Sequence, residues 1–594
     1  MRQTTRKALW LTAGAIGVWM GGAALYAQTG AETAGLELIY STYLGGTGEE
    51  LEPSLALDAQ GQVYMTAASA SPDFPIVGGF DSWYDVEHFP QQVVFAKLGP
   101  GGALAYSSRA GAPFINDVSR DIAVGADGSI NITGWIDGGD DTEVMVTRFT
   151  QLDAGGFDLF DFSGESGDIA EAIALDPQGN LYVAGFSNSF WFPSQQPNMG
   201  DAGAFVMKLD PGLGILALHF LPQGAVWPSG LALDAAGNIY LTGWANSQMP
   251  TLNAAQPSFG GGQRDTYVWK LDPSGNPVWG TFLGGSLADE STSIAVDPAG
   301  NVWVAGWTDS PDFPTRNALQ PSSAGGRDAF VTKLSASGSF VFSTFLGGAS
   351  ADEALGIALA ERDGAHLTGL TASPDFPLVH PLQACGPGSS PACGGTEAFV
   401  ATLDSAGTHL ILSTFLGGGG DDRGTDIAIG PNGDLFITGL TSSTDFPTRN
   451  AYQPALAGSS DFFVTRLRTN PPPDCSAATA SPSIIWPPNG KLVPVSITGV
   501  TGSGDPITLA ITGITQDESW TGKTPDASGI GTSSAQVRAS RAGKGDGRVY
   551  HLAFEATNPQ GASCTGTVAV CVPHDRGRGA ACGDGGALFD STRR

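Results

Sequence analysis

The chain has 594 residues, of which 41% are hydrophobic, and its 58 acidic and 28 basic side chains give a formal net charge of −30. This length is enough for at least two independently packed domains. The negative charge would repel phosphate backbones and anionic lipid headgroups, so it argues against nucleic acid and leaves cations, glycans and other proteins as partners. The 84 glycines and 39 prolines lie among alternating Val, Ile, Thr and Phe, a pattern that predicts an all-β protein.

Residues 1–27 have the pattern of a cleaved signal peptide. Basic residues at 2, 6 and 7 precede an apolar run over 8–25, and Ala27 is a small residue of the kind found at cleavage sites. The alternative is an uncleaved membrane anchor, because 18 residues are close to the minimum for a bilayer span, although four glycines in the run disfavour it. We expect the protein to be exported and either secreted or held at the cell surface, with no transmembrane helix after cleavage.

Seven similar segments follow, of the type "IALDPQGNLYVAG", and each has an alanine near its start. Successive alanines are 67, 51, 58, 63, 63 and 70 residues apart, a mean of 62, which suits a four-stranded propeller blade. We expect alanine there because the innermost strand has least room between neighbouring sheets. The alanines are Ala56, Ala123, Ala174, Ala232, Ala295, Ala358 and Ala428.

Each repeat predicts four strands, which we call a to d. In the fifth repeat, strand a is "IAV", the turn "DPAGN" leads to strand b, "VWVAG", a longer loop leads to strand c, "AFVTKL", and a short turn leads to strand d, "FSTFLGG". The Asp, Asn and Gly of the first turn are typical hairpin residues, so we interpret them as turn formers rather than ligands.

The strand count explains an odd feature of the N-terminus. Strand c occurs seven times, and the last copy, "FFVTRL" at 462–467, is followed by prolines instead of a strand d. The missing copy is "YSTYLGG" at 40–46, ahead of the first repeat. If Tyr40 to Leu44 pairs with Phe462 to Leu467, the two ends of the chain complete one blade, and a seven-bladed propeller of 28 strands has no free edge.

The segments "STFLGG", "IAVDPAGNVWVAGWTDSPDFPT" and "DAFVTKL" resemble the bacterial SBBP family of β-propeller repeats. The resemblance covers residues 36–469. It implies an exported propeller and no established reaction, so it bears on the fold more than on the function.

A second domain is expected after the proline-rich linker at 470–474. Alternating segments such as "LVPVSITGV" and "VYHLAFEAT" predict an immunoglobulin-like β-sandwich over 475–573, and the stretch resembles bacterial modules that serve as spacers or adhesion units. The Gly- and Arg-rich end, 574–594, is predicted to be disordered.

The six cysteines agree with export to an oxidising compartment. Cys385 and Cys393 bracket a Gly/Pro/Ser insertion in the sixth repeat and are a candidate disulfide. The remaining four allow three pairings, which the sequence does not rank. Their spacing is unlike that of zinc ligands. The four are Cys475, Cys564, Cys571 and Cys582.

The strand order places the long b-to-c loops and the d-to-a crossovers on one face, where we expect ligand recognition. Adjacent acids recur in these crossovers. A turn element that accepts backbone hydrogen bonds is the favoured interpretation, with a calcium site or catalysis as alternatives. The pairs are Glu49 and Glu50, Asp289 and Glu290, Asp352 and Glu353, and Asp421 and Asp422.

Aromatic and basic residues also recur at equivalent positions of the repeats. Trp135, Phe186, Trp244 and Trp307 follow the strand-b glycine in consecutive repeats and favour packing between blades over a stacking platform. The basic residues of strand c favour pairing with loop acids. The better ligand-binding candidates are aromatic residues in irregular b-to-c loops, namely Trp83, Tyr84, Phe89, Phe190 and Trp191.

The sequence contains no "HExxH", "GxSxG" or "GxxxxGK[ST]" motif, and its seven histidines form no cluster. We therefore expect a non-catalytic recognition or scaffold protein that binds a glycan or an extracellular protein, with calcium as the one candidate cofactor. The alternative is a carbohydrate-active hydrolase or lyase that uses carboxylates at the propeller mouth.

Overall fold

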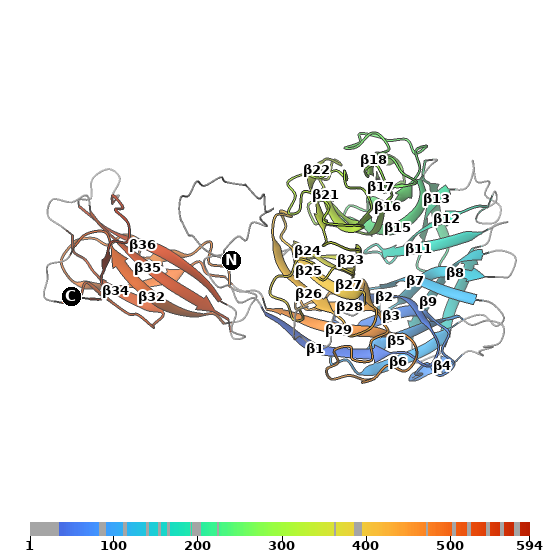
Figure 1. Cartoon of the computed structure of the whole chain (residues 1–594), viewed down its shortest axis with the longest axis horizontal. Coiled ribbons are helices and arrows are strands. Elements are labelled where there is room, and N and C mark those ends of the chain that lie inside the picture. The colour runs from blue at the N-terminus through green and yellow to red at the C-terminus, as the bar shows by residue number, and fades with distance from the viewer. Residues whose placement is uncertain are drawn as a thin grey trace, which may run out of the picture. The chain divides into compact units, whose positions relative to one another are not determined.

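The computed structural model of the chain is shown in Figure 1. It describes residues 35–81, 91–110, 116–137, 142–151, 156–162, 167–189, 192, 203–222, 225–360, 364–384, 395–470, 473–501, 506–519, 524–541, 547–558, 563–574 and 582–593. The chain forms two compact units: a repeat unit, Ala34–Pro471, and a C-terminal unit that includes Pro472–Arg594. Over the described ranges, no helix has the length and apolar character needed to cross a membrane.

The described part of the repeat unit is all-β and forms seven antiparallel, propeller-like sheets. Five contain four consecutive strands: β7 (Asn116–Val124), β8 (Ile130–Asp137), β9 (Thr142–Gln151) and β10 (Gly156–Phe162); β11 (Asp168–Leu175), β12 (Leu181–Ser187), β13 (Gly203–Leu209) and β14 (Ile215–Phe220); β15 (Ala225–Leu233), β16 (Ile239–Ala245), β17 (Asp265–Leu271) and β18 (Pro277–Leu283); β19 (Asp289–Val296), β20 (Val302–Thr308), β21 (Asp328–Leu334) and β22 (Phe340–Leu346); β23 (Asp352–Ala360), β24 (Gly364–Thr371), β25 (Glu397–Leu403) and β26 (Leu410–Leu416).

The other two sheets of this unit depart from that pattern. In the first repeat, β2 (Glu50–Leu57), β3 (Val63–Ser69), β5 (Gln92–Leu98) and β6 (Leu104–Ala110) are joined by β4 (Gly78–Asp81), which runs parallel to β6. In the last repeat, β27 (Asp422–Ile429), β28 (Leu435–Thr441) and β29 (Asp461–Asn470) are joined by β1 (Gly35–Leu44) from the start of the unit. Leu44 lies opposite Phe462, and Tyr40 lies opposite Arg466. The strand pairing predicted between the two ends is therefore present.

We call the first strand of each sheet its inner strand: β2, β7, β11, β15, β19, β23 and β27. Each inner strand contacts the inner strand of the next sheet along the chain, and β27 also contacts β2. Figure 1 shows β2, β11, β15, β23 and β27 toward the middle of the repeat unit.

The hydrophobic core of this unit lies between neighbouring sheets. One cluster joins Tyr240 and Val268 of β16 and β17 to Val302 and Phe330 of β20 and β21, and the repeat alanine Ala232 packs against it. The small side chain fits the narrow space between two inner strands, as the repeat pattern predicts. Corresponding alanines pack against the equivalent clusters at Ala56, Ala123, Ala295, Ala358 and Ala428.

The turns after the inner strands have the predicted turn chemistry. Asp297 Oδ1 accepts the backbone N–H groups of Ala299 and Asn301, at 3.1 and 2.8 Å. Gly300 has φ +79°, a left-handed conformation that glycine adopts without a steric penalty. These aspartates therefore close the turns.

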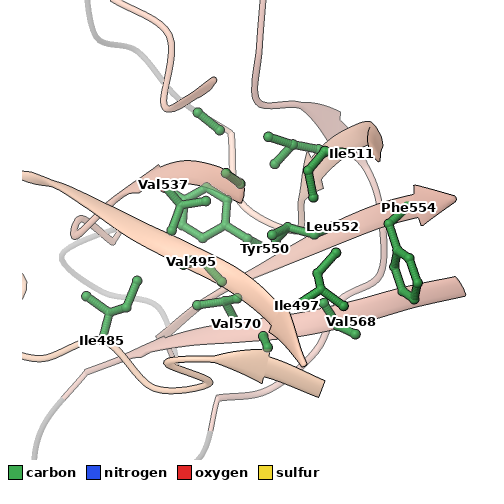
Figure 2. Close-up of a cluster of buried hydrophobic side chains, with 14 of the residues drawn as sticks. Ile485, Val495, Ile497, Ile511, Val537, Tyr550, Leu552, Phe554, Val568 and Val570 are labelled. Atoms are coloured by element: carbon green, nitrogen blue, oxygen red, sulfur yellow. The ribbon is translucent and has the colours of Figure 1, made fainter. Parts of the chain in front are cut away.

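The C-terminal unit contains two four-stranded sheets over its described residues. They are β30 (Thr479–Ser481), β31 (Leu492–Thr498), β34 (Ser534–Arg538) and β33 (Ala527–Ser528), and β36 (Ser563–Pro573), β35 (Gly547–Thr557), β32 (Thr508–Gln516) and β37 (Phe589–Asp590). Val495 and Val537 from one sheet share a core with Tyr550, Leu552 and Val570 from the other (Figure 2).

Two disulfides lie in the C-terminal unit, Cys475–Cys564 and Cys571–Cys582. The second one holds part of the segment for which composition predicts disorder. Its strand β37 pairs with β32, and Ser591 is buried and donates its hydroxyl to Gln516 Oε1 at 3.0 Å. The prediction of disorder over 574–594 is therefore not met over residues 582–593. The Cys571–Cys582 disulfide and the pairing of β37 with β32 hold these residues in place. Cys385 and Cys393 lie outside the described residues.

Candidate functional site

A cavity of about 570 Å³ lies between the inner strands of the repeat unit. All seven inner strands contribute to its lining, so no single repeat contains the site. The lining contains seven charged side chains and one aromatic ring among small polar and aliphatic residues. The charged and aromatic residues include Glu52 of β2, Arg120 of β7, Glu171 of β11, Trp227 of β15, Glu290 of β19 and Arg423 of β27.

A β-bulge in every inner strand positions the lining. Each inner strand shifts register against its neighbour near its middle, and the shift leaves at least one residue without a partner on the next strand. All of these bulged residues line the cavity. They are Glu52 and Pro53 of β2, Arg120 of β7, Glu171 of β11, Ser229 of β15, Thr292 of β19, Leu355 of β23 and Thr425 of β27.

On one side of the cavity, Arg120 lies between two carboxylates. It forms an ion pair with Glu52, and its Nε lies 3.4 Å from Glu171 Oε2. Burial raises the pKa of Glu171, while Arg120 and a hydrogen bond from the Trp227 side chain act in the opposite direction. Trp227 stacks on Phe186 of β12, with ring centroids 5.7 Å apart and planes 18° from parallel. The aromatic surface and the carboxylate therefore lie in one part of the pocket.

Two buried carboxyls meet at Ser54, which also lines the cavity. Ser54 Oγ lies 3.1 Å from Asp121 Oδ1 and 3.0 Å from Asp426 Oδ2. One hydroxyl group therefore lies within hydrogen-bond distance of both carboxyls. Burial raises the pKa of Asp121 to about 7, and the nearby charge of Asp426 adds to the effect.

Asp121 and Asp426 also tie neighbouring inner strands together. Asp121 Oδ2 accepts the backbone N–H of Ile173 in β11 at 2.9 Å, and Asp426 Oδ2 accepts that of Leu55 in β2, also at 2.9 Å. These bonds provide acceptors for backbone N–H groups of the neighbouring inner strands. The two carboxyls therefore hold the shape of the pocket wall.

In two of the predicted acid pairs, the two side chains have different partners. Asp289 is fully buried and accepts the backbone N–H of Gly285 at 2.7 Å and the Ser310 hydroxyl at 2.9 Å, whereas Glu290 pairs with Arg264 at 3.1 Å. Asp352 and Glu353 separate in the same way. Asp352 accepts hydrogen bonds from Gly348, Thr371 and Ser373. Glu353 pairs with Arg327 at 2.7 Å.

In the last repeat the equivalent position is shifted by one residue. Asp422 lies opposite Thr441, as Asp289 lies opposite Thr308, and it accepts the Gly418 N–H and the Ser443 hydroxyl. The residue equivalent to Glu290 is therefore Arg423, and Asp421 is an exposed residue that accepts the Thr396 N–H at 2.9 Å. Within the described ranges, no three His, Cys, Asp or Glu side chains gather in a way that would hold a metal ion.

The aromatic residues predicted as a row lie on the second strands. Phe186 and Trp307 are buried, and Trp307 is covered by Arg327, whose guanidinium carbon lies 3.6 Å from the ring centroid. Trp244 and Trp307 therefore pack against arginines, and Phe186 packs against Trp227. Trp83, Tyr84, Phe89, Phe190 and Trp191, the predicted ligand-binding residues, lie outside the described part of the chain.

The basic residues of strand c are structural, as predicted. Lys333 pairs with the turn acid Asp297 at 3.3 Å and lies over the Trp303 ring, and Arg466 pairs with Asp434 at 2.5 Å. Arg148 and Lys208 also pair with turn acids, namely Asp127 and Asp176.

The sequence prediction missed the bulged residues, although the repeats contain a signal for them. The position three residues before the repeat alanine varies widely, whereas the alanine and the turn that follows it are regular. The residues there are Pro53, Arg120, Glu171, Ser229, Thr292, Leu355 and Thr425, and all of them line the pocket.

The chain was compared with known proteins and protein families. Three solved structures resemble the chain: a protein of unknown function from Dyadobacter fermentans (9% identity, 73% of this chain and 100% of that one, TM-score 0.36), the polysaccharide lyase Uly1 (11%, 70% and 90%, 0.39) and a gluconolactonase from Xanthomonas campestris (11%, 74% and 92%, 0.30). No curated protein matches the sequence. Residues 222–248 and 278–314 match the SBBP β-propeller repeat, which supports an SBBP-type β-propeller.

Proposed function

We propose that the chain is an exported recognition protein that binds a glycan in the pocket between the inner strands. In this proposal, 1–27 is a signal peptide and 36–469 is a seven-bladed propeller closed by its N-terminal strand. Residues 470–474 are a linker, and 475–573 form an immunoglobulin-like module that acts as a spacer. The two disulfides of the C-terminal unit support an oxidising compartment outside the cytoplasm.

One observation carries the proposal: the bulged residues of all seven inner strands line one cavity. A volume of about 570 Å³ is in the range of small-ligand pockets and is large enough for one or two sugar rings. Sugars are bound by an aromatic ring face together with charged hydrogen-bonding groups, and Trp227 with Glu171 supplies both. The lining residues come from the first halves and middles of the inner strands, on the side of the crossovers where recognition is expected.

A glycan array tests this function. The full chain should bind at least one glycan, and Trp227→Ala should abolish the signal because it removes the aromatic face of the pocket. Trp486→Ala is the matched control, since Trp486 is 38% exposed in the C-terminal unit. Absence of any glycan binding, or equal binding by the Trp227 variant, would contradict the proposal.

Glycan cleavage is a second candidate, favoured by Glu171. Burial raises the pKa of this carboxyl beside Trp227, as a general acid for glycoside cleavage requires. Catalysis would release new reducing ends from a bound glycan, and Glu171→Gln would stop the release while binding persists. Binding without product would leave recognition as the function.

A further inference from the structure

Arg423 differs from the other charged residues of the pocket because it has neither an ion pair nor a hydrogen bond among the described residues. It is the second residue of β27 and lines the cavity. Among the described residues, its guanidinium makes no hydrogen bond and no ion pair, and only Glu353 acts on it electrostatically, from beyond ion-pair distance. The Arg423 side chain is half-buried, and this burial lowers the pKa of its guanidinium.

The other arginines around the pocket each have a carboxylate partner. Arg120 pairs with Glu52 and Glu171. Arg264 pairs with Glu290 at 3.1 Å. Arg327 pairs with Asp309 and Glu353, at 2.9 and 2.7 Å. Arg423 is partly buried and, unlike these three arginines, has no carboxylate partner among the described residues.

The acids of the pocket are already engaged. Glu52 and Glu171 share Arg120, Glu290 has Arg264, and Asp121 and Asp426 accept backbone N–H groups and contact Ser54. Each of these carboxyls therefore already has a cation or a hydrogen-bond partner, and none of them pairs with Arg423. Arg423 retains its hydrogen-bond donors for a ligand.

We propose that Arg423 selects glycans that carry a carboxylate, so that the pocket takes a hexuronate in preference to the neutral hexose. This inference rests on the proposed glycan-binding function. A carboxylate presents two oxygens to the planar guanidinium and forms two parallel charge-assisted hydrogen bonds. Arg423 on β27 anchors the acid group, and Trp227 on β15 packs against the sugar ring.

Matched monosaccharide pairs test the selection. Sodium glucuronate and glucose, and sodium galacturonate and galactose, are titrated into the full chain, and ligand signals are followed by saturation-transfer NMR. The hexuronate of at least one pair should bind about tenfold more tightly than its hexose, the value of one charge-assisted contact. Arg423→Gln should remove the difference between hexuronate and hexose, whereas Arg264→Gln, which removes a paired arginine, should keep it.

The outcomes separate the two proposals. Equal binding of hexuronate and hexose, or a preference that persists in Arg423→Gln, overturns the role of Arg423 and leaves glycan binding standing. Absence of binding by any of the four sugars and by every glycan of the array overturns both.

A stability measurement distinguishes a ligand-binding role from a structural one. Because the unpaired cation is partly desolvated, Arg423→Gln should melt at the same temperature as the unmodified chain or higher in the absence of ligand. A clear fall in melting temperature would show that Arg423 supports the fold, and it would overturn the assignment.

Discussion

Ser41 Oγ and Thr465 Oγ1 lie 2.8 Å apart in the buried interface between β1 and β29, although 424 positions separate them in the sequence. The contact fixes the register in which the N-terminal strand completes the last sheet. Tyr40, Tyr43 and Leu44 are buried by the same pairing. The strand that begins the repeat unit therefore belongs to the sheet that ends it.

Deletion of residues 35–44 should destabilise the repeat unit severely. Each of the three large side chains that β1 buries is worth about 2 kcal/mol, and the ladder of β29 would be left open. Calorimetry should show a large fall in melting temperature and a broader transition. Deletion of residues 28–33, which precede β1, is the control and should leave the transition unchanged. An unaltered melting temperature after loss of β1 would refute the role of this strand.

The buried carboxyls of Asp265 and Asp289 should make the repeat unit less stable as pH rises. Burial raises the pKa of Asp265 to about 7 and that of Asp289 to about 6, and Asp289 adds to the shift at Asp265. Since the folded state binds more protons than the unfolded chain between about pH 4 and 7, the free energy of unfolding falls as pH rises through this window. Urea unfolding at pH 5 and pH 8 measures the difference.

Asp265→Asn should reduce that difference by stabilising the protein at pH 8, because the amide cannot ionise. Asp312→Asn is a control of opposite sign. Hydrogen bonds from Ser286 lower the pKa of Asp312, so its stabilising contribution is present at neutral pH and is lost as pH falls through the folded pKa. The Asn variant should lose stability at pH 8 and little at pH 3. A change in the free energy of unfolding at pH 8 with the same sign in both variants would contradict the opposite pKa shifts of Asp265 and Asp312.

Asp352→Ala should cost about 3 kcal/mol of stability. The carboxylate accepts the Gly348 N–H at 2.7 Å and the Ser373 hydroxyl at 2.8 Å, and its removal leaves buried donors without partners, each worth about 1–3 kcal/mol. Asp375→Ala removes a more exposed crossover contact and should cost less. Chemical denaturation of both variants provides the test, and equal stabilities would contradict it.

Calcium should leave the melting temperature of the repeat unit unchanged. Asp289, Asp352 and Asp422 direct their oxygens at backbone amides and hydroxyls, and Glu290 and Glu353 are paired with arginines. Scanning calorimetry with excess calcium and with a chelator checks this expectation. A calcium-dependent rise in melting temperature would show a cation site that these contacts do not explain.

The two disulfides should differ in their contributions to the C-terminal unit. Cys475–Cys564 closes a separation of 89 residues and Cys571–Cys582 one of 11, which corresponds to about 4.6 and about 2.8 kcal/mol by loop entropy. Replacing Cys564 and its partner by serine should therefore lower the melting temperature of this unit more than replacing Cys571 and its partner. A larger effect of the shorter loop would contradict this order.

Much of the architecture is predictable because it follows from local patterns that recur. The repeat alanine, the Asp and Gly of each turn, and the displaced segment at 40–46 each report a constraint that acts within one repeat or between two strands. Pairing of Tyr40 with the strand at 462–467 needs only a count of strands, and the structure has that pairing.

The pocket could not be predicted in the same way, because its residues come from seven strands and are exposed by bulges. A bulge changes which face a side chain occupies, and strict alternation assigns Arg120 and Glu171 to the wrong face. The aspartates of the acid pairs accept backbone hydrogen bonds, as the favoured interpretation predicts, but one detail of the last pair was not foreseen. The regular spacing of Asp421 and Asp422 with the earlier pairs conceals a shift of one residue, which places Arg423 where Glu290 and Glu353 lie in other sheets.

A crystal structure of the full chain with its best-binding glycan tests the central claim most directly. The account predicts a sugar ring against Trp227, within the cavity lined by the bulged residues, with an acid group on Arg423. Sugar bound only at the b-to-c loops or on the C-terminal unit, with the cavity occupied by solvent, would contradict it.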